Sequence, residues 1–150
     1  MVGARRAARR LALDALYEAE IRDMLPLEAF QERLGARWSA TSEDGAEGLE
    51  EPSAEALGYA RGLVEGVQAH QAELDELIAS YADRWALGRM PVIDRNLLRI
   101  GLFELLWGED IPVAVAINEA VELAKSLSTD DSGRFINGLL GRIAEDRCAG

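Results

Sequence analysis

The sequence predicts an all-helical fold, and three observations support this. Apolar residues recur three and four positions apart along most of the 150 residues, which is the spacing of one face of an α-helix. No stretch alternates apolar and polar residues for long enough to indicate a β-strand. Pro26, Pro91 and Pro112 each stand where one helical pattern ends and another begins. We therefore expect about seven helices packed into a bundle.

The first half of the chain predicts three helices and one loop. The first helix covers residues 4–24, and the second runs from about Leu27 to Trp38. Ser53 is suited to cap the third helix, which should end near His70. Residues 39–53 hold five acidic residues, two glycines and no basic residue. This composition predicts a flexible acidic loop.

The second half predicts four more helices. The fourth follows from the spacing of the apolar residues between Leu74 and Trp85. Residues 92–107 are apolar almost all round, so we expect this fifth helix at the buried centre of the fold. A sixth helix follows Pro112. The seventh begins within "STDDSGRFINGLLGRI", residues 128–143, and one of its faces carries Ile136, Leu139, Leu140 and Ile143.

Composition argues against several classes of protein. No run of about 18 apolar residues occurs, so we expect no membrane span. The N-terminus is basic and then apolar, but acidic residues from Asp14 onward argue against a signal peptide. The single cysteine, Cys148, fits a reducing cytoplasm, where we expect the protein. With His70 as the only histidine, we expect no metal site and no cofactor.

Four arginines near the N-terminus are the most informative feature. Arg5, Arg6, Arg9 and Arg10 lie within six residues, although the chain has a net charge of −11. On a helix they cover one side, which leads on to Tyr17. Arginine donates paired hydrogen bonds to phosphates, and an aromatic ring can stack on a base. Electrostatic fields fade over about 8 Å at physiological salt, so this patch can bind RNA despite the acidic remainder. Pairing with the acidic loop, or plain solvation, fits the spacing equally well.

The start of the last predicted helix also has two interpretations. Ser128, Thr129 or Asp130 caps the helix, and Phe135 is then a residue at the edge of the core. Alternatively, Phe135 and its polar neighbours form a binding surface together with the N-terminal arginines. Helical periodicity does not decide between these interpretations.

We expect no enzymatic activity and no catalytic residues. The segment "INEAVELAK" offers Asn118, Glu119, Glu122 and Lys125, but these lie on one polar helix face. Such a face is typical of solvent exposure. The sequence shows no phosphate-binding loop and no paired nucleophile and base.

Three segments stand out, which are "ARRAARRLALDALYEAE", "DRNLLRIGLFELLW" and "IPVAVAINEAVELAKSLSTDDSGRFINGLLGRI", in that order. Together they resemble the NusB family of bacterial transcription antitermination factors. Residues 25–90 match the family in helical pattern more than in letters. The resemblance implies two packed three-helix bundles that share a long central helix. Here the N-terminal bundle would take about residues 4–70 and the C-terminal bundle about residues 71–146.

The resemblance also implies partners. With NusE, which is also a protein of the small ribosomal subunit, these factors bind the boxA element of nascent RNA. They help RNA polymerase transcribe ribosomal RNA operons completely, and they have no enzymatic activity. The expected partners are therefore single-stranded boxA-type RNA, NusE and the RNA polymerase antitermination complex.

The resemblance assigns residues to two surfaces. Those at the RNA would be Arg5, Arg6, Arg9, Arg10, Ser132, Arg134, Phe135 and Asn137. The NusE-facing surface would include Tyr17 and Asp94. Ala7 interrupts the basic block where some relatives have another basic residue, so RNA binding should depend more on NusE.

Other functions remain open at this stage. Some family members form homodimers that bury the RNA-binding face. One alternative is a helical adaptor or dimerisation protein that binds no RNA. Another is a stand-alone relative of the RNA-binding domain of ribosomal RNA methyltransferases. Those enzymes need a Rossmann-type domain, and no such domain lies within these 150 residues.

Overall fold

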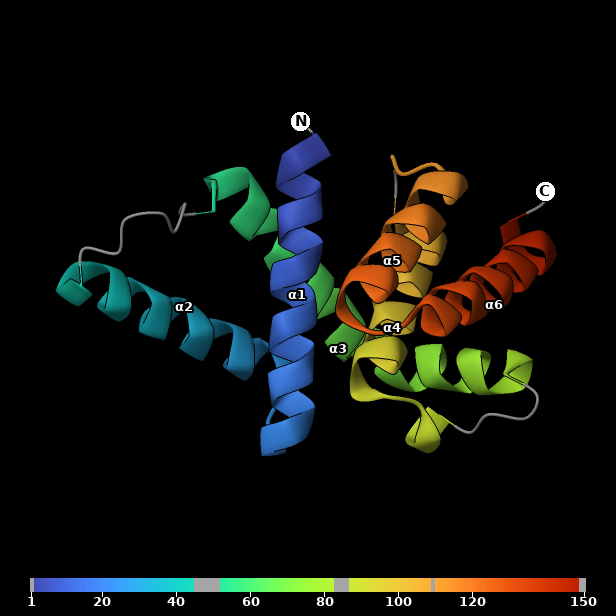
Figure 1. Cartoon of the computed structure of the whole chain (residues 1–150), viewed down its shortest axis with the longest axis horizontal. Coiled ribbons are helices and arrows are strands. Elements are labelled where there is room, and N and C mark those ends of the chain that lie inside the picture. The colour runs from blue at the N-terminus through green and yellow to red at the C-terminus, as the bar shows by residue number, and fades with distance from the viewer. Residues whose placement is uncertain (1, 45–51, 83–86, 109, 149–150) are drawn as a thin grey trace. The chain divides into compact units, whose positions relative to one another are not determined.

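The protein is helical throughout the part that a computed structural model describes, which is residues 2–44, 52–82, 87–108 and 110–148. Within these ranges there is no strand, and the all-helical prediction is confirmed (Figure 1). No described helix is long and apolar enough to cross a membrane. The elements are α1 (Val2–Arg22), α2 (Pro26–Asp44), α3 (Ala54–Tyr81), the 3-10 helix η1 (Leu87–Arg89), α4 (Val92–Trp107), α5 (Val113–Leu127) and α6 (Asp130–Cys148).

The chain divides into two compact units, Met1–Gln68 and Ala69–Gly150. In the first unit α1 packs against α2. The two helices are joined by a tight turn in which Asp23 has a positive φ of 52°. The buried apolar residues of this unit are Ala8, Ala12, Leu13, Ala15, Leu16, Ala19, Ala29, Phe30, Ala56, Ala60, Leu63, Val64 and Val67.

A proline and a hydrogen bond to a side chain define the start of α2. Pro26 is the first residue of α2, and the Leu27 N–H donates to Gln68 Oε1 at 2.9 Å.

α2 continues to Asp44, so residues 39–44 are helical where the sequence predicted a loop. This stretch lacks glycine and proline, and the first helix breaker is Gly45. The remainder of the predicted loop, residues 45–51, lies outside the described residues. Ser53 caps α3, as predicted, because its Oγ accepts the Ala56 N–H at 3.1 Å.

The third and fourth predicted helices are one helix, α3, which corrects the expected seven helices to six in the described residues. Its backbone departs from helical geometry at His70, where φ is −113° and ψ is 15°. No glycine or proline follows His70 within α3, so the helix resumes after a kink. The His70 ring stacks on Trp107, with centroids 4.2 Å apart and an interplanar angle of 20°.

In the second unit, α5 packs against α4 and α6, and α4 also contacts α6. Gly101 of α4 permits this close approach, because a Cβ there would lie 2.8 Å from Leu140 Cδ1. The predicted inner face of the last helix is confirmed: Ile136, Leu139, Leu140 and Ile143 are all fully buried. Arg99 of α4 donates to both carboxylate oxygens of Asp75, at 2.7 and 3.0 Å, and so ties α4 to α3.

Candidate functional site

The four arginines near the start of α1 lie on two sides of the helix. Arg6 and Arg10 are exposed, Arg5 is half-buried, and only 3% of Arg9 is exposed. Residues four apart share a helix face, so Arg5 lies beside Arg9 and Arg6 lies beside Arg10. Arg9 offers little surface for a direct contact with RNA in this structure, and its contact with RNA stays a prediction.

Tyr59 of α3 lies beside Arg5 and Arg9, which sequence spacing did not predict. The Arg5 guanidinium carbon is 4.9 Å from the centroid of the Tyr59 ring, and that of Arg9 is 5.8 Å away. Both distances fall within the range of cation–π attraction, which contributes about 0.5–1 kcal/mol at exposed sites. The ring therefore holds both arginines in position against α3. The only sequence signal for this contact was an aromatic residue in a helix of the same predicted bundle.

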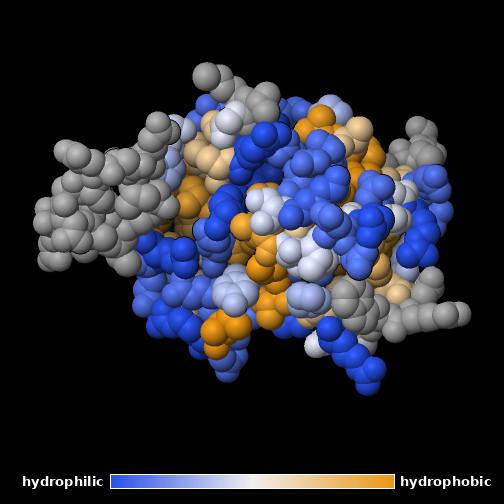
Figure 2. All heavy atoms as spheres, in the orientation of Figure 1, coloured by the Kyte–Doolittle hydropathy of each residue, from blue (hydrophilic) through white to orange (hydrophobic). Residues whose placement is uncertain are grey.

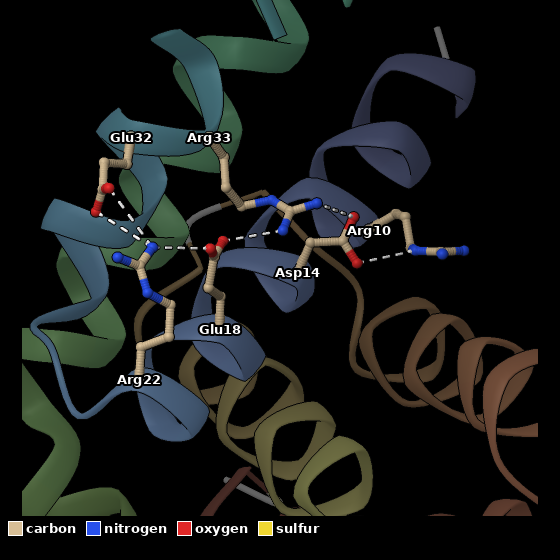
Figure 3. A network of polar contacts seen from close by, with 6 residues as sticks. All are labelled: Arg10, Asp14, Glu18, Arg22, Glu32 and Arg33. Atoms are coloured by element: carbon tan, nitrogen blue, oxygen red, sulfur yellow. Dashed lines mark hydrogen bonds and ion pairs between the residues drawn. The ribbon is translucent and has the colours of Figure 1, made fainter. Parts of the chain in front are cut away.

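Arg10 belongs to a network of charged residues on α1 and α2 (Figure 3). Its Nε donates to Asp14 at 3.2 Å, and Asp14 also lies 3.7 Å from Arg33. Glu18 accepts hydrogen bonds from Arg33 at 3.0 Å and from Arg22 at 3.1 Å. The hydrogen bond from Arg33 is the main cause of a lowered pKa of the Glu18 carboxyl. A phosphate that approaches Arg10 must therefore compete with Asp14.

Three exposed apolar residues on α1 and in the turn after it are here called the apolar strip. Tyr17 is 42% exposed, Ile21 is 60% exposed, and Leu25 in the following turn is 54% exposed. Most of the surface visible in Figure 2 is hydrophilic, with hydrophobic residues in smaller separate areas. Single exposed apolar residues are common, whereas a row of them is typical of a surface that another protein covers. The sequence predicted a partner-binding role for Tyr17 but not for Ile21 or Leu25. Ile21 lies four positions after Tyr17, which is the helical spacing that could have indicated it.

Hydrogen bonds among short side chains build the first turn of α6. Thr129 is the cap, because its Oγ1 accepts the Ser132 N–H at 2.9 Å. The Thr129 hydroxyl also donates to Ser132 Oγ at 3.0 Å. Ser132 Oγ in turn donates to Asp94 Oδ2 at 2.6 Å. Because Asp94 lies in the first turn of α4, this chain of hydrogen bonds ties the start of α6 to the start of α4.

Asp94 and Ser132 are interior residues, of which only 0% and 5% are exposed. The resemblance implies that Asp94 faces NusE and that Ser132 lies at the RNA, and both contacts stay predictions. An acidic residue at the start of a helix is normally solvated. The hydrogen bond from Ser132 to Asp94 joins residues 38 positions apart, and helical spacing does not predict such a contact. The other carboxylate oxygen of Asp94, Oδ1, is buried with no hydrogen-bond partner among the described residues.

The three remaining α6 residues lie closer to solvent. Arg134 is exposed and forms an ion pair with Asp131. Asn137 is exposed, and Phe135 is half-buried. These three side chains follow directly on the turn that Asp94 and Ser132 hold in place.

A groove of about 790 Å³ lies between α5 and α6. Arg134 and Asn137 line it from α6, and Asn118, Glu122 and Lys125 line it from α5. Asn118, Glu122 and Lys125 are exposed, as the predicted solvated face requires, whereas only 5% of Glu119 is exposed. The groove places the three exposed residues together with two of the predicted RNA contacts.

The predicted RNA-binding residues thus belong to two local surfaces. The α1 arginines lie in the first unit, and residues 132–137 lie in the second. Among the described residues, no group of histidine, cysteine, aspartate and glutamate side chains is arranged to hold a metal ion.

Comparison with known proteins gives consistent results. Residues 6–145 match the model of the NusB family. The chain is 56% identical over 142 residues to "Transcription antitermination protein NusB" of Salinispora arenicola (strain CNS-205), covering 95% of this chain and 96% of that protein. A solved structure of T. maritima NusB is 35% identical, with a TM-score of 0.79, and the match covers 95% of this chain and 91% of the other.

A second solved structure contains partners. It is described as antitermination factors NusB and NusE in complex with dsRNA. The matching chain is 27% identical to this one, with a TM-score of 0.77, and the match covers 97% of this chain and 99% of that one.

Proposed function

This chain belongs to the NusB family, and on that premise we propose that it is a transcription antitermination factor. Together with NusE it binds the boxA element of nascent RNA and helps RNA polymerase complete ribosomal RNA operons. The observation that carries the proposal is the 56% identity to a protein named for this function, over 95% of this chain. The chain acts by binding and not by catalysis.

The proposed RNA-binding residues fall into contacting and supporting groups. Arg5, Arg6 and Arg10 of α1 contact phosphates, because guanidinium groups donate paired hydrogen bonds to phosphate oxygens. Arg134 does the same from α6. The exposed position of Arg6, Arg10 and Arg134 supports this assignment.

The remaining α6 residues suit contacts with bases. Phe135 is half-buried, so one part of its ring can pack on the protein while another stacks on a base. Asn137 is exposed, and its amide both donates and accepts hydrogen bonds, as recognition of a base edge requires.

The buried residues of the predicted site act indirectly. Arg9 is held at the Tyr59 ring, and Ser132 and Asp94 fix the first turn of α6. Their effect on RNA binding comes through the exposed neighbours that they keep in position.

We assign the NusE-facing surface to the apolar strip of Tyr17, Ile21 and Leu25. These residues are 42–60% exposed, and covering them would remove apolar area from water. Glu18 and Glu20 follow Tyr17 in the sequence, but Glu18 is already paired with Arg22 and Arg33. The assignment therefore rests on the apolar residues and not on charge.

Transcription in vitro tests the function. A bacterial transcription extract is depleted of its own NusB-family protein, and the chain is then added with NusE. The template carries a boxA leader upstream of a terminator, and a matched template carries a scrambled boxA. We expect restored read-through on the boxA template alone. Equal read-through on both templates, or none on either, would contradict the proposal.

A further inference from the structure

The contact between Tyr59 and the arginines points to a role that the family assignment does not supply. Arg5 and Arg9 are one helical turn apart on α1, and Tyr59 is on α3. The guanidinium carbons lie 4.9 and 5.8 Å from the same ring centroid. One aromatic ring therefore attracts two cations at the basic end of α1.

We propose that Tyr59 is a positioning residue of the RNA-binding surface, which holds the Arg5 guanidinium in place before RNA arrives. This inference rests on the proposed function. An unrestrained arginine loses much side-chain freedom when it contacts a phosphate. A guanidinium already ordered against a ring loses less, so binding is tighter for the same contact.

Burial assigns different parts to the two arginines. Arg5 is half-buried and keeps surface that can meet RNA, whereas only 3% of Arg9 is exposed. Arg9 therefore contributes mainly to the contact between α1 and the ring. Tyr59 is itself half-buried, and Arg5 lies over its ring. The ring thus acts through Arg5 and not as a stacking surface for a base.

A double-mutant cycle tests this inference. The variants are Tyr59→Leu, Arg5→Ala and their combination, and the measurement is the Kd of a short single-stranded boxA RNA in the presence of NusE. We expect Tyr59→Leu to weaken binding about 5-fold in the natural background. In the Arg5→Ala background the same substitution should weaken binding about 2-fold or less, because the group that it positions is gone.

Arg6 provides the matched control, because it is an exposed arginine on the other side of α1. Tyr59→Leu should cost the full factor of about 5 in an Arg6→Ala background. Tyr59→Phe, which keeps the ring, should bind RNA like the natural protein. The salt dependence of binding should be unchanged in Tyr59→Leu, since the number of charges that meet phosphates stays the same.

Several results would overturn the inference. They are an equal effect of Tyr59→Leu with and without Arg5, no effect of Tyr59→Leu at all, or a loss in Tyr59→Phe as large as in Tyr59→Leu. Thermal unfolding of each variant identifies a loss that comes from misfolding. Failure of the proposed function is distinguishable, because the natural protein would then also fail to bind RNA.

A measurement on the natural protein avoids any risk that Tyr59→Leu fails to fold. In NMR spectra the side-chain protons of Arg5 should be shifted upfield by the ring current of Tyr59, and those of Arg6 should not. Ordinary random-coil shifts for Arg5 would show that the ring does not hold it, and would overturn the inference without any RNA.

Discussion

Ser132 Oγ donates a hydrogen bond of 2.6 Å to Asp94 Oδ2, and both residues are buried. Asp94 lies in the first turn of α4, and Ser132 lies in the first turn of α6. The bond therefore fixes the start of the helix that carries Arg134 and Asn137. Burying a carboxylate costs free energy that hydrogen-bond donors offset, and Ser132 donates to one of the two oxygens of Asp94.

Removal of this donor should destabilise the fold. Ser132→Ala leaves the Asp94 carboxylate buried without its hydrogen bond, so we expect the free energy of unfolding to fall by about 2 kcal/mol. Ser126→Ala is the control, because Ser126 is an exposed serine on α5, and it should change stability by less than about 0.5 kcal/mol. Urea unfolding of the two variants measures the difference. Equal stability of the two would mean that the Asp94 contact contributes nothing.

Arg6 should contribute directly to RNA binding. We expect Arg6→Ala to reduce the slope of log affinity against log salt by about 0.7, the value for one phosphate contact on a single strand. Arg61→Ala removes the same charge from an exposed arginine of α3, which is paired with Glu65 at 2.8 Å. This control should leave the slope unchanged. Fluorescence anisotropy over a salt series gives both slopes, and a shift of equal size in both variants would indicate only a general charge effect.

Ile21 should contribute to NusE binding and not to folding. It is 60% exposed, so Ile21→Ser removes apolar area that only a partner would bury. We expect NusE affinity to fall about 10-fold, while thermal stability stays within error. Val113→Ser tests specificity, because Val113 is 38% exposed on α5 and lies outside the strip. Isothermal titration calorimetry measures both. Unchanged NusE affinity in Ile21→Ser would move the NusE surface elsewhere.

Glu18 should stabilise the fold only above acidic pH. Hydrogen bonds, chiefly from Arg33, lower its pKa below the ordinary value of 4.5. A carboxyl whose pKa is lower in the folded state stabilises that state above its unfolded pKa, and this stabilisation disappears as the pH falls through the folded pKa. The side chain is partly exposed and screened by water, so we expect a contribution below about 1 kcal/mol.

The variant Glu18→Gln isolates this contribution. It should be less stable than the natural protein in urea unfolding at neutral pH, and the difference should vanish well below pH 4.5. A difference that persists in strong acid would assign the effect to packing and not to charge.

Helical spacing predicted the fold well where apolar residues decide it. The face of Ile136, Leu139, Leu140 and Ile143 followed from their positions alone, and all four are fully buried. The kink at His70 did not follow, because two helical patterns in succession look the same whether a loop or a single distorted residue joins them. The end of α2 at Asp44 was missed because acidic, polar composition indicated a loop although no helix breaker was present.

The candidate site was predicted less completely, because spacing gives the direction of a side chain but not its partner. Arg9 and Arg6 look alike in the sequence, yet one is buried at the Tyr59 ring and the other is exposed. Asp94 looked like a surface residue because its partner Ser132 lies 38 positions away. Packing between residues that are distant in sequence therefore decides which of the predicted residues are exposed to RNA and which are buried beneath them.

Binding of a short single-stranded boxA RNA, with and without NusE, at 50 and 200 mM salt tests the central claim most directly. If about four phosphates are contacted, a slope of −0.7 for each predicts roughly a 50-fold loss of affinity over that range. We expect a loss of this order, tighter binding with NusE, and weaker binding by Arg6→Ala. Absent binding, or binding that is insensitive to salt even with NusE present, would contradict it.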